Sequence, residues 1–227
     1  MATPVLSLNK VGKFYGPKLV FRNVTFDIHA GEAVIVGGSN GAGKTTLLRI
    51  MTGLSDASAG ECVCSLPPEK VAYLGHATFI YPQMTALQNL KFWGRMYDVP
   101  VGTDILEGIL KRVGLLFAAH ERAGSFSRGM AQRLNLARIF LVKPELVFLD
   151  EPGTGLDAAS LNLLRREITA MHDEGTTIIW VSHQLDEDRA LVDRVIYLKN
   201  NTLEWQGAAS EFSMDIAMDT IGENAGC

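Results

Sequence analysis

A glycine-rich segment has the residue types and spacing of a phosphate-binding loop. It reads Gly38-Ser39-Asn40-Gly41-Ala42-Gly43-Lys44-Thr45 and matches the pattern G-x-x-x-x-G-K-[ST], after an apolar stretch and before a helical one. Glycines let backbone N–H groups approach phosphate oxygens, and a helix N-terminus adds partial positive charge. Lys44 is expected to hold the β- and γ-phosphates, Thr45 to bind Mg²⁺, and Thr46 to place a second hydroxyl near the phosphates. The alternative is a glycine turn with a solvated lysine.

Two carboxylates follow a second apolar stretch. Asp150 and Glu151 come directly after Leu146-Val147-Phe148-Leu149, which has the length of a buried strand. A packed interior does not tolerate two acids, so we expect them at the carboxyl edge of a sheet, where α/β folds bind ligands. Asp150 is then placed to hold Mg²⁺ through water, and Glu151 to orient or deprotonate an attacking water. The alternative for Asp150 is an ordinary turn or helix cap.

The elements that must position these residues alternate between strands and helices. Apolar and polar residues alternate over the first thirty positions, which predicts short antiparallel strands. Continuous apolar runs predict buried strands, and spacings of three and four predict helices. Strands are expected at 33–36, 61–64, 71–74, 146–149, 177–181, 195–198 and 202–205, and helices at 44–51, from 127 to Pro144, at 158–172 and after His183. This order predicts an α/β fold with a mostly parallel sheet.

The stretch between the two site motifs has a different character. Helical spacing near 87–97 and 105–113 predicts two amphipathic helices there. We therefore expect one domain over 1–227, with a core from 1–75 and 126–207, a helical subdomain at 76–125 and a tail at 208–227.

The composition excludes several classes of protein. The 227 residues carry 21 Lys and Arg against 25 Asp and Glu, a net charge of −4, so we expect no nucleic-acid partner. No stretch approaches the ~18 to 20 apolar residues of a membrane-spanning helix. The N-terminus shows no secretion signal, which predicts a cytoplasmic protein. The three cysteines, Cys62, Cys64 and Cys227, fit neither a disulfide framework nor a zinc site with two ligand pairs.

Five ordered motifs make the chain resemble the ATP-binding-cassette (ABC) ATPases from about Leu6 to Gly207. They are Gly38–Thr45, Phe126–Met130 followed by Gln132–Leu134, Leu149–Pro152, Gly155–Asp157 and Val181–His183. The resemblance implies a P-loop NTPase fold of ABC type, with an antiparallel N-terminal β subdomain and an inserted helical subdomain. It also implies ATP and Mg²⁺ as cofactors and hydrolysis of ATP to ADP and phosphate.

The resemblance also implies roles for single residues. Tyr15 resembles the aromatic residue that stacks on adenine, and His183 resembles the switch histidine that contacts the γ-phosphate. Ser127 and Gly129 resemble the signature positions that bind the γ-phosphate of ATP held by a second copy, and Asp157 resembles the dimer-contact aspartate. By itself, a histidine after a strand is more often an ordinary surface or core residue.

The chain departs from the family pattern at three positions. Arg128 stands where many relatives have Gly and some Ala, and Met130 stands where Gln is common. Arg128 either adds a cation to the phosphate site or points to solvent, and we favour solvent. His76 stands where most relatives have the glutamine that senses Mg²⁺ and the membrane partner, so His76 is a candidate for that role. Gln83 lies too far along to replace it.

Two short stretches resemble the ATPase subunit of the haem exporter of cytochrome c maturation. They are Val71–His76 and Thr85–Phe92, with Gln88 in place of the usual Glu. The resemblance implies a translocase subunit at the cytoplasmic face of the inner membrane, with membrane permease subunits and a second copy of itself as partners. We expect the permease to dock around residues 85–97. The alternatives are another small-molecule or lipid exporter, a soluble ABC ATPase, and a P-loop kinase or GTPase.

Overall fold

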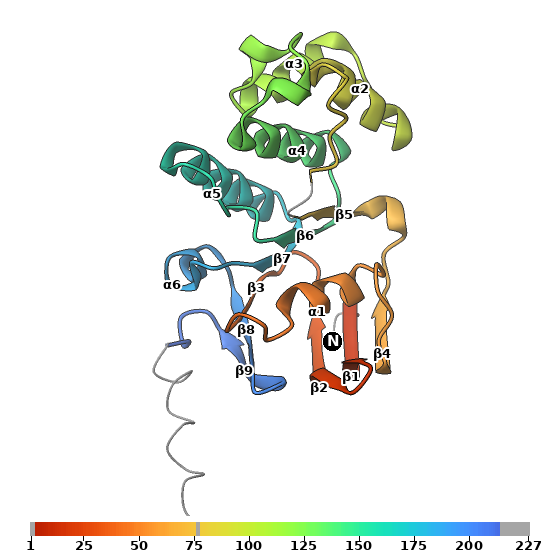
Figure 1. Cartoon of the computed structure of the whole chain (residues 1–227), viewed down its shortest axis with the longest axis vertical. Helices are drawn as coiled ribbons and strands as arrows, with labels where there is room; N and C mark the ends of the chain where they lie inside the picture. The colour runs from red at the N-terminus through yellow and green to blue at the C-terminus, as the bar shows by residue number, and fades with distance from the viewer. Residues whose placement is uncertain (1–2, 76–77, 214–227) are drawn as a thin grey trace, which may run out of the picture. The chain divides into compact units, whose positions relative to one another are not determined.

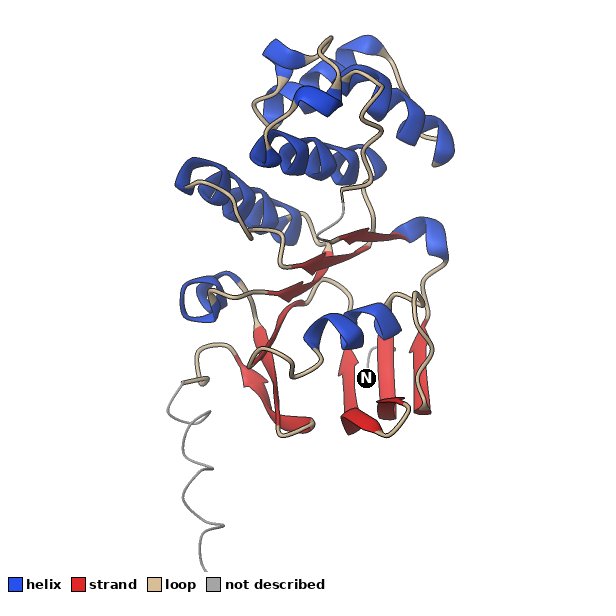
Figure 2. Cartoon of the chain, viewed as in Figure 1, coloured by secondary structure: helices blue, strands red, loops and turns tan. Residues whose placement is uncertain are grey.

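The structure is a computed structural model that describes residues 3–75 and 78–213. These residues form two units. The first comprises residues 3–65 and 177–213, and the second comprises residues 66–75 and 78–176. Figures 1 and 2 show the helices and strands of each unit. Within the described residues, no helix combines the length and the hydropathy that a bilayer crossing requires.

An antiparallel sheet of the first unit contains three strands. β1 (Leu6–Tyr15) pairs with β2 (Lys18–Ile28) on one side and with β4 (Ala59–Cys64) on the other. Alternate side chains are buried over Leu6–Leu8 of β1 and Val24–Ile28 of β2, as the alternation of apolar and polar residues predicts. In the other parts of these strands, neighbouring residues such as Val20 and Phe21 are both buried. The expected antiparallel strands at the N-terminus are therefore present, and β1 and β2 are longer than predicted.

The other strands of the first unit are mostly parallel. β3 (Ala33–Gly38) lies between β7 (Thr177–Val181) and β8 (Arg194–Lys199) and is parallel to both, whereas β9 (Thr202–Ala208) pairs antiparallel with β8. The side chains of β7, and those of β3 up to Gly37, are buried, which explains their uninterrupted apolar sequences. The helices of this unit are α1 (Lys44–Met51) and α6 (Leu185–Asp188).

The second unit combines a parallel strand pair with four longer helices. β5 (Val71–Leu74) pairs with β6 (Leu146–Asp150). The helices are α2 (Ala86–Met96), α3 (Thr103–Arg112), α4 (Arg128–Val142) and α5 (Ala158–Asp173), and α2, α3 and α4 pack together (Figure 1). Single 3₁₀ turns occupy Pro68–Lys70, Leu116–Ala118, Ala123–Ser125 and, in the first unit, Arg189–Leu191. The predicted α/β class and the two helices expected between the site motifs are confirmed.

Side-chain caps mark where α2, α4 and α5 begin in the second unit. Thr85 and Gln88 form a capping box at the start of α2, with N···O distances of 3.1 and 2.9 Å. The side chain of Ser127 caps α4, and that of Asp157 caps α5. The resemblance assigns Ser127 to the partner's ATP and Asp157 to the dimer contact. Each of these residues therefore stands at a helix N-terminus.

Candidate functional site

The phosphate loop joins β3 to α1 in the first unit. Gly38 and Gly43 have φ angles of 143° and 98°, which L side chains rarely adopt. A Cβ atom at Gly38 would lie 2.5 Å from the Leu198 carbonyl oxygen, and one at Gly43 would lie 2.7 Å from Val20 Cγ1. These two positions therefore require glycine, because backbone conformation and close neighbours both exclude a side chain. Ser39, Asn40 and Gly41 form the exposed part of the loop.

Lys44 places its ammonium group inside this loop. Its Nζ donates hydrogen bonds to the carbonyl oxygens of Gly38, at 2.8 Å, and Ser39, at 3.1 Å, and the residue is only 6% exposed. Thr45 and Thr46 follow in the first turn of α1 and are half-buried. The loop thus combines backbone curvature, a helix N-terminus and a held cation, which is the chemistry that binds a polyphosphate. The ammonium of Lys44 is thus held by the loop and is not solvated.

Two further candidate residues of the first unit are exposed. Tyr15 ends β1 with 55% of its surface exposed, and Lys13 Nζ lies 5.1 Å from its ring centroid. His183 follows β7 in a turn that Ser182 organises. The Ser182 hydroxyl donates to the buried carboxylate of Asp188 and accepts from the Gln184 N–H at 2.9 Å. Ser182 and Asp188 therefore hold the turn that presents His183.

The carboxylates stand at the end of β6 in the second unit. Asp150 is its last residue, is 1% exposed, and accepts a hydrogen bond of 2.9 Å from the Tyr73 hydroxyl on β5. Asp150 is not a helix cap. Glu151 has a φ of 52°, so the chain turns sharply directly after the strand, and the Thr154 N–H donates to its carbonyl oxygen at 3.1 Å. The two acids thus differ in their environments, because Asp150 is buried and Glu151 is half-buried.

The segment after Glu151 packs against the start of α4. Gln132 Nε2 donates to the Pro152 carbonyl oxygen at 3.2 Å. Arg128 is exposed, yet its guanidinium lies against Gly155, where an added Cβ would be 2.7 Å from Nη1. The expectation that Arg128 simply points to solvent is therefore incomplete, because the charged end rests on the loop that carries Gly155. Arg128 and Glu151 also line the same small cavity of about 50 Å³.

The signature residues and Asp157 stand near one another in this unit. Ser127 accepts a hydrogen bond from the Met130 N–H at 3.2 Å, and a Cβ at Gly129 would lie 3.4 Å from Ser160 Oγ in α5. The carboxylate of Asp157 accepts from the Ser160 N–H at 2.7 Å, and this backbone hydrogen bond lowers the pKa of Asp157. Asp157 therefore stays ionised at neutral pH.

The donor atoms suit Mg²⁺ chemically. The hydroxyl of Thr45 and the carboxylate of Asp150 are hard oxygen ligands, which Mg²⁺ prefers. Thr45 belongs to the first unit and Asp150 to the second. His76, the third candidate for this ion, lies outside the described residues. The described part of the chain contains no group of three His, Cys, Asp or Glu side chains that could hold a metal ion.

Comparison with known proteins decides the family. The family model described as "ABC transporter" matches residues 21–154. The chain belongs to the ABC transporter family. The chain is 39% identical over 168 residues to the cytochrome c biogenesis ATP-binding export protein CcmA of Cereibacter sphaeroides, covering 74% of this chain and 77% of CcmA. It is 29% identical over 228 residues to the linearmycin resistance ATP-binding protein LnrL of Bacillus subtilis, covering 96% of this chain and 73% of LnrL.

A solved structure shares the ABC ATPase fold. It is a dimeric ATP-binding cassette in a post-hydrolysis state, bound to ADP and Pi. Its chain is 24% identical, with a TM-score of 0.79 over 91% of this chain and all of that one. The predicted ABC-type ATPase fold and the recognition of the family are thereby confirmed. The chain is an ATP-binding subunit of the ABC transporter type.

Sequence reasoning missed three residues that support the ABC motifs. Tyr73 orients Asp150, Gln132 anchors the segment after Glu151, and Asp188 anchors the turn of His183. The motif spacing carries no signal for the Tyr73 contact, which joins residues on two different strands. The turn of His183 had a weak local signal at Ser182, because serine side chains often hydrogen-bond to nearby backbone groups.

Proposed function

We propose that this chain is the ATP-hydrolysing subunit of an exporter that moves haem for cytochrome c maturation. The observation that carries the choice of cargo is the 39% identity to a cytochrome c biogenesis export protein. The stretches Val71–His76 and Thr85–Phe92, which resemble that subfamily, support it. In this proposal the energy source is ATP, and the membrane passage is supplied by other subunits.

The proposed hydrolysis gives each predicted site residue a role. Lys44 and the loop N–H groups hold the β- and γ-phosphates, Tyr15 stacks on adenine, and His183 contacts the γ-phosphate. Glu151 orients the attacking water and accepts its proton. Thr45 and Asp150 would hold Mg²⁺, which when bound neutralises phosphate charge. The held ammonium of Lys44 and the oriented carboxylate of Asp150 support these roles.

A second copy of the chain completes the proposed site. Ser127 and Gly129 of one copy bind the γ-phosphate held by the other, and Asp157 contacts the dimer partner. Their places at the starts of α4 and α5 support this, because helix N-termini favour an anion and Asp157 stays ionised. Closure around ATP and reopening after hydrolysis then drive the permease subunits.

The permease is proposed to dock on the aromatic cluster at α2. Phe92 and Trp93 of α2 contact Tyr81 with ring centroids 4.6 and 6.2 Å apart, and the exposed Phe79 contacts Trp93 at 6.4 Å. Met96, at the end of α2, is 64% exposed. This apolar surface supports docking of a permease at the cytoplasmic face of the inner membrane.

A second candidate function is export of another small molecule or a lipid. The match to a linearmycin resistance protein, which covers nearly the whole chain, favours it. The ATP-binding groups would act as described, and only the permease and its cargo would differ. A soluble ABC ATPase is the least supported alternative.

The test is a pull-down of tagged Glu151→Gln protein with ATP from detergent-solubilised membranes, with the same bait without ATP as control. Partners are identified by mass spectrometry, and a haem absorption spectrum is recorded. Small polytopic partners with bound haem would support haem export. An unrelated permease would replace the cargo, and recovery of no membrane protein would contradict the transporter assignment.

A further inference from the structure

A cavity of about 280 Å³ lies in the second unit. The C-terminal ends of α3, α4 and α5 form its walls. Its lining combines apolar side chains with four charged ones at Arg112, Lys143, Glu145 and Glu174. None of the residues from the phosphate loop, the signature or the carboxylate pair belongs to the lining. A volume of this size is close to that of sites for small ligands, which start at roughly 300 Å³.

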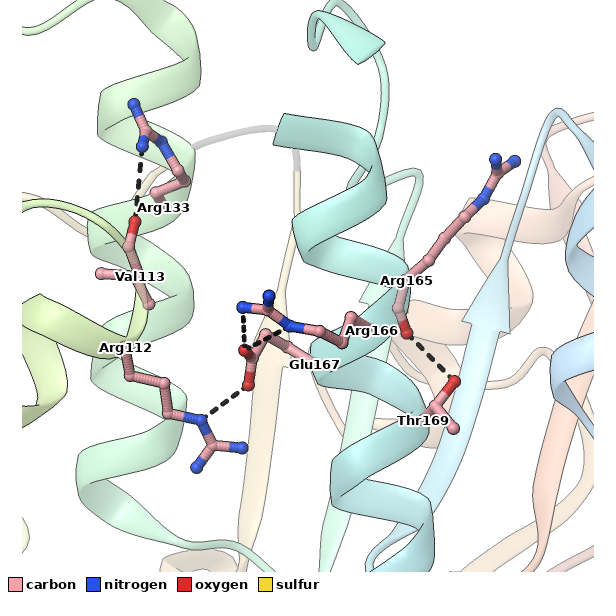
Figure 3. A network of polar contacts seen from close by, with 7 residues as sticks. All are labelled: Arg112, Val113, Arg133, Arg165, Arg166, Glu167 and Thr169. Atoms are coloured by element: carbon pink, nitrogen blue, oxygen red, sulfur yellow. Dashed lines mark hydrogen bonds and ion pairs between the residues drawn. The ribbon is translucent and has the colours of Figure 1, made fainter. Parts of the chain in front are cut away.

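The guanidinium of Arg112 is held by a hydrogen bond along one edge and by an aromatic ring against one face. Its Nε donates to Glu167 at 2.6 Å, and the group stacks on the Phe140 ring, 3.9 Å from the centroid. Figure 3 shows the terminal nitrogens of Arg112 directed away from Glu167. Within the described chain these two nitrogens make no hydrogen bond or ion pair. A rigid guanidinium with a free donor edge is a preorganised receptor for a carboxylate.

The surrounding charges leave a small positive excess. Glu167 is 5% exposed and is bound by Arg166, at 2.9 Å, as well as by Arg112, so two cations share one carboxylate (Figure 3). At the rim, Glu145 pairs with Lys70 at 3.1 Å, while Lys143 and Glu174 are both exposed. One anionic group is therefore attracted, whereas a polyanion such as a nucleotide would meet the repulsion of the two rim acids.

The apolar part of the lining selects the rest of the ligand. Ile139, Phe140, Pro144 and Met171 face the cavity and offer a surface for a flat or branched hydrocarbon group. We propose that this cavity binds a small monocarboxylate with an apolar body, the carboxylate on the free edge of Arg112. The ligand would touch α4 and α5 at the ends opposite to Ser127 and Asp157. The proposal does not depend on the haem or the ATPase assignment.

The test is a ligand-detected NMR titration of the full chain with phenylacetate, and with the uncharged phenylacetamide as matched probe. Phenylacetate should bind, and the amide should bind at least about tenfold more weakly, as expected for loss of a charge-assisted pairing. Arg112→Lys keeps a cation for Glu167 but removes the planar fork, and should weaken phenylacetate about tenfold. Lys143→Gln should weaken it less, because Lys143 is exposed at the rim.

The control variant is Lys111→Gln, which removes the neighbouring exposed cation of α3 that does not line the cavity. Its phenylacetate affinity should equal that of the wild type. Thermal unfolding verifies that each variant is folded, and Lys143→Gln keeps the test decisive if Arg112→Lys does not fold. Absence of phenylacetate binding at millimolar concentration, equal binding of the amide, or equal losses in Lys143→Gln and Lys111→Gln would overturn the proposal.

Discussion

In the proposed mechanism, Lys44 is the residue on which nucleotide binding depends most directly. Its ammonium lies inside the loop, bound to two loop carbonyl oxygens, and its proposed role is to pair with the phosphates. We predict that Lys44→Ala reduces ATP affinity at least about tenfold, as expected for loss of a charge-assisted contact. Equilibrium binding of a fluorescent ATP analogue measures this. Lys111→Ala, at an exposed position of α3 outside the ABC motifs, is the control, and unchanged binding by Lys44→Ala would contradict the role of the loop.

Arg128 is a position at which this chain departs from the family pattern, and the structure shows what its side chain contacts. Because the guanidinium rests on Gly155 and lines a cavity with Glu151, it should hold in place the segment that carries Glu151, the proposed catalytic carboxylate. We predict that Arg128→Ala lowers the kcat of ATP hydrolysis about tenfold, with a smaller change in KM, since displacement of a catalytic group is costly. Arg128→Lys should restore part of the rate.

Two comparisons make the prediction for Arg128 specific. Gly155→Ala should lower kcat as well, because the added Cβ would displace the guanidinium of Arg128. The φ of 75° at this position also disfavours a side chain. Arg122→Ala removes an exposed cation outside this contact and should leave kcat unchanged. Steady-state assays of all four variants decide. Equal kcat in wild type and Arg128→Ala would show that the guanidinium is only a surface group.

At the scale of elements, the sequence predicts features that depend on local signals, but it does not predict contacts between residues far apart in the chain. α1 occupies 44–51 as expected, because its loop, its apolar spacing and its end are all local features. The hydrogen bond from Tyr73 to Asp150 joins residues 77 positions apart and exists only because β5 and β6 pair in parallel. Periodicity predicts that each strand exists, but not which hydroxyl meets which carboxylate. The expected boundaries of the helical subdomain stay a prediction.

The start of α5 gives a pH-dependent prediction. The Ser160 N–H holds the pKa of Asp157 below its usual value. That usual value, which applies to the unfolded chain, is about 3.9. A carboxyl group with a lower pKa in the folded state than in the unfolded state stabilises the fold when the pH is above its unfolded-state pKa. This stabilisation is lost as the pH falls through the folded-state pKa. Asp157→Ala should therefore lower the urea midpoint at pH 7, and the difference from wild type should shrink below about pH 4. Urea unfolding at both pH values measures it, and a difference independent of pH would contradict the ionised cap.

At the scale of the whole molecule, the proposed mechanism needs the ATP-binding motifs of one copy and the signature of a second copy. Family membership followed from five motifs because each is short, local and chemically constrained. The cargo could not be derived in the same way, because none of these motifs is assigned to contact with it. The pull-down described above addresses the cargo, whereas hydrolysis itself can be tested on the isolated chain.

The most direct test of the account is the rate of ATP hydrolysis by wild type and Glu151→Gln side by side, with Mg²⁺ present. Glutamine keeps the size of the side chain and removes the group that accepts the proton of the attacking water. We predict hydrolysis by the wild type and a rate at least about 100-fold lower in the variant, the usual effect of losing a general base. Light scattering on the same samples should show an ATP-dependent dimer for the variant. Hydrolysis by Glu151→Gln at the wild-type rate would contradict the assignment of Glu151 as the catalytic carboxylate.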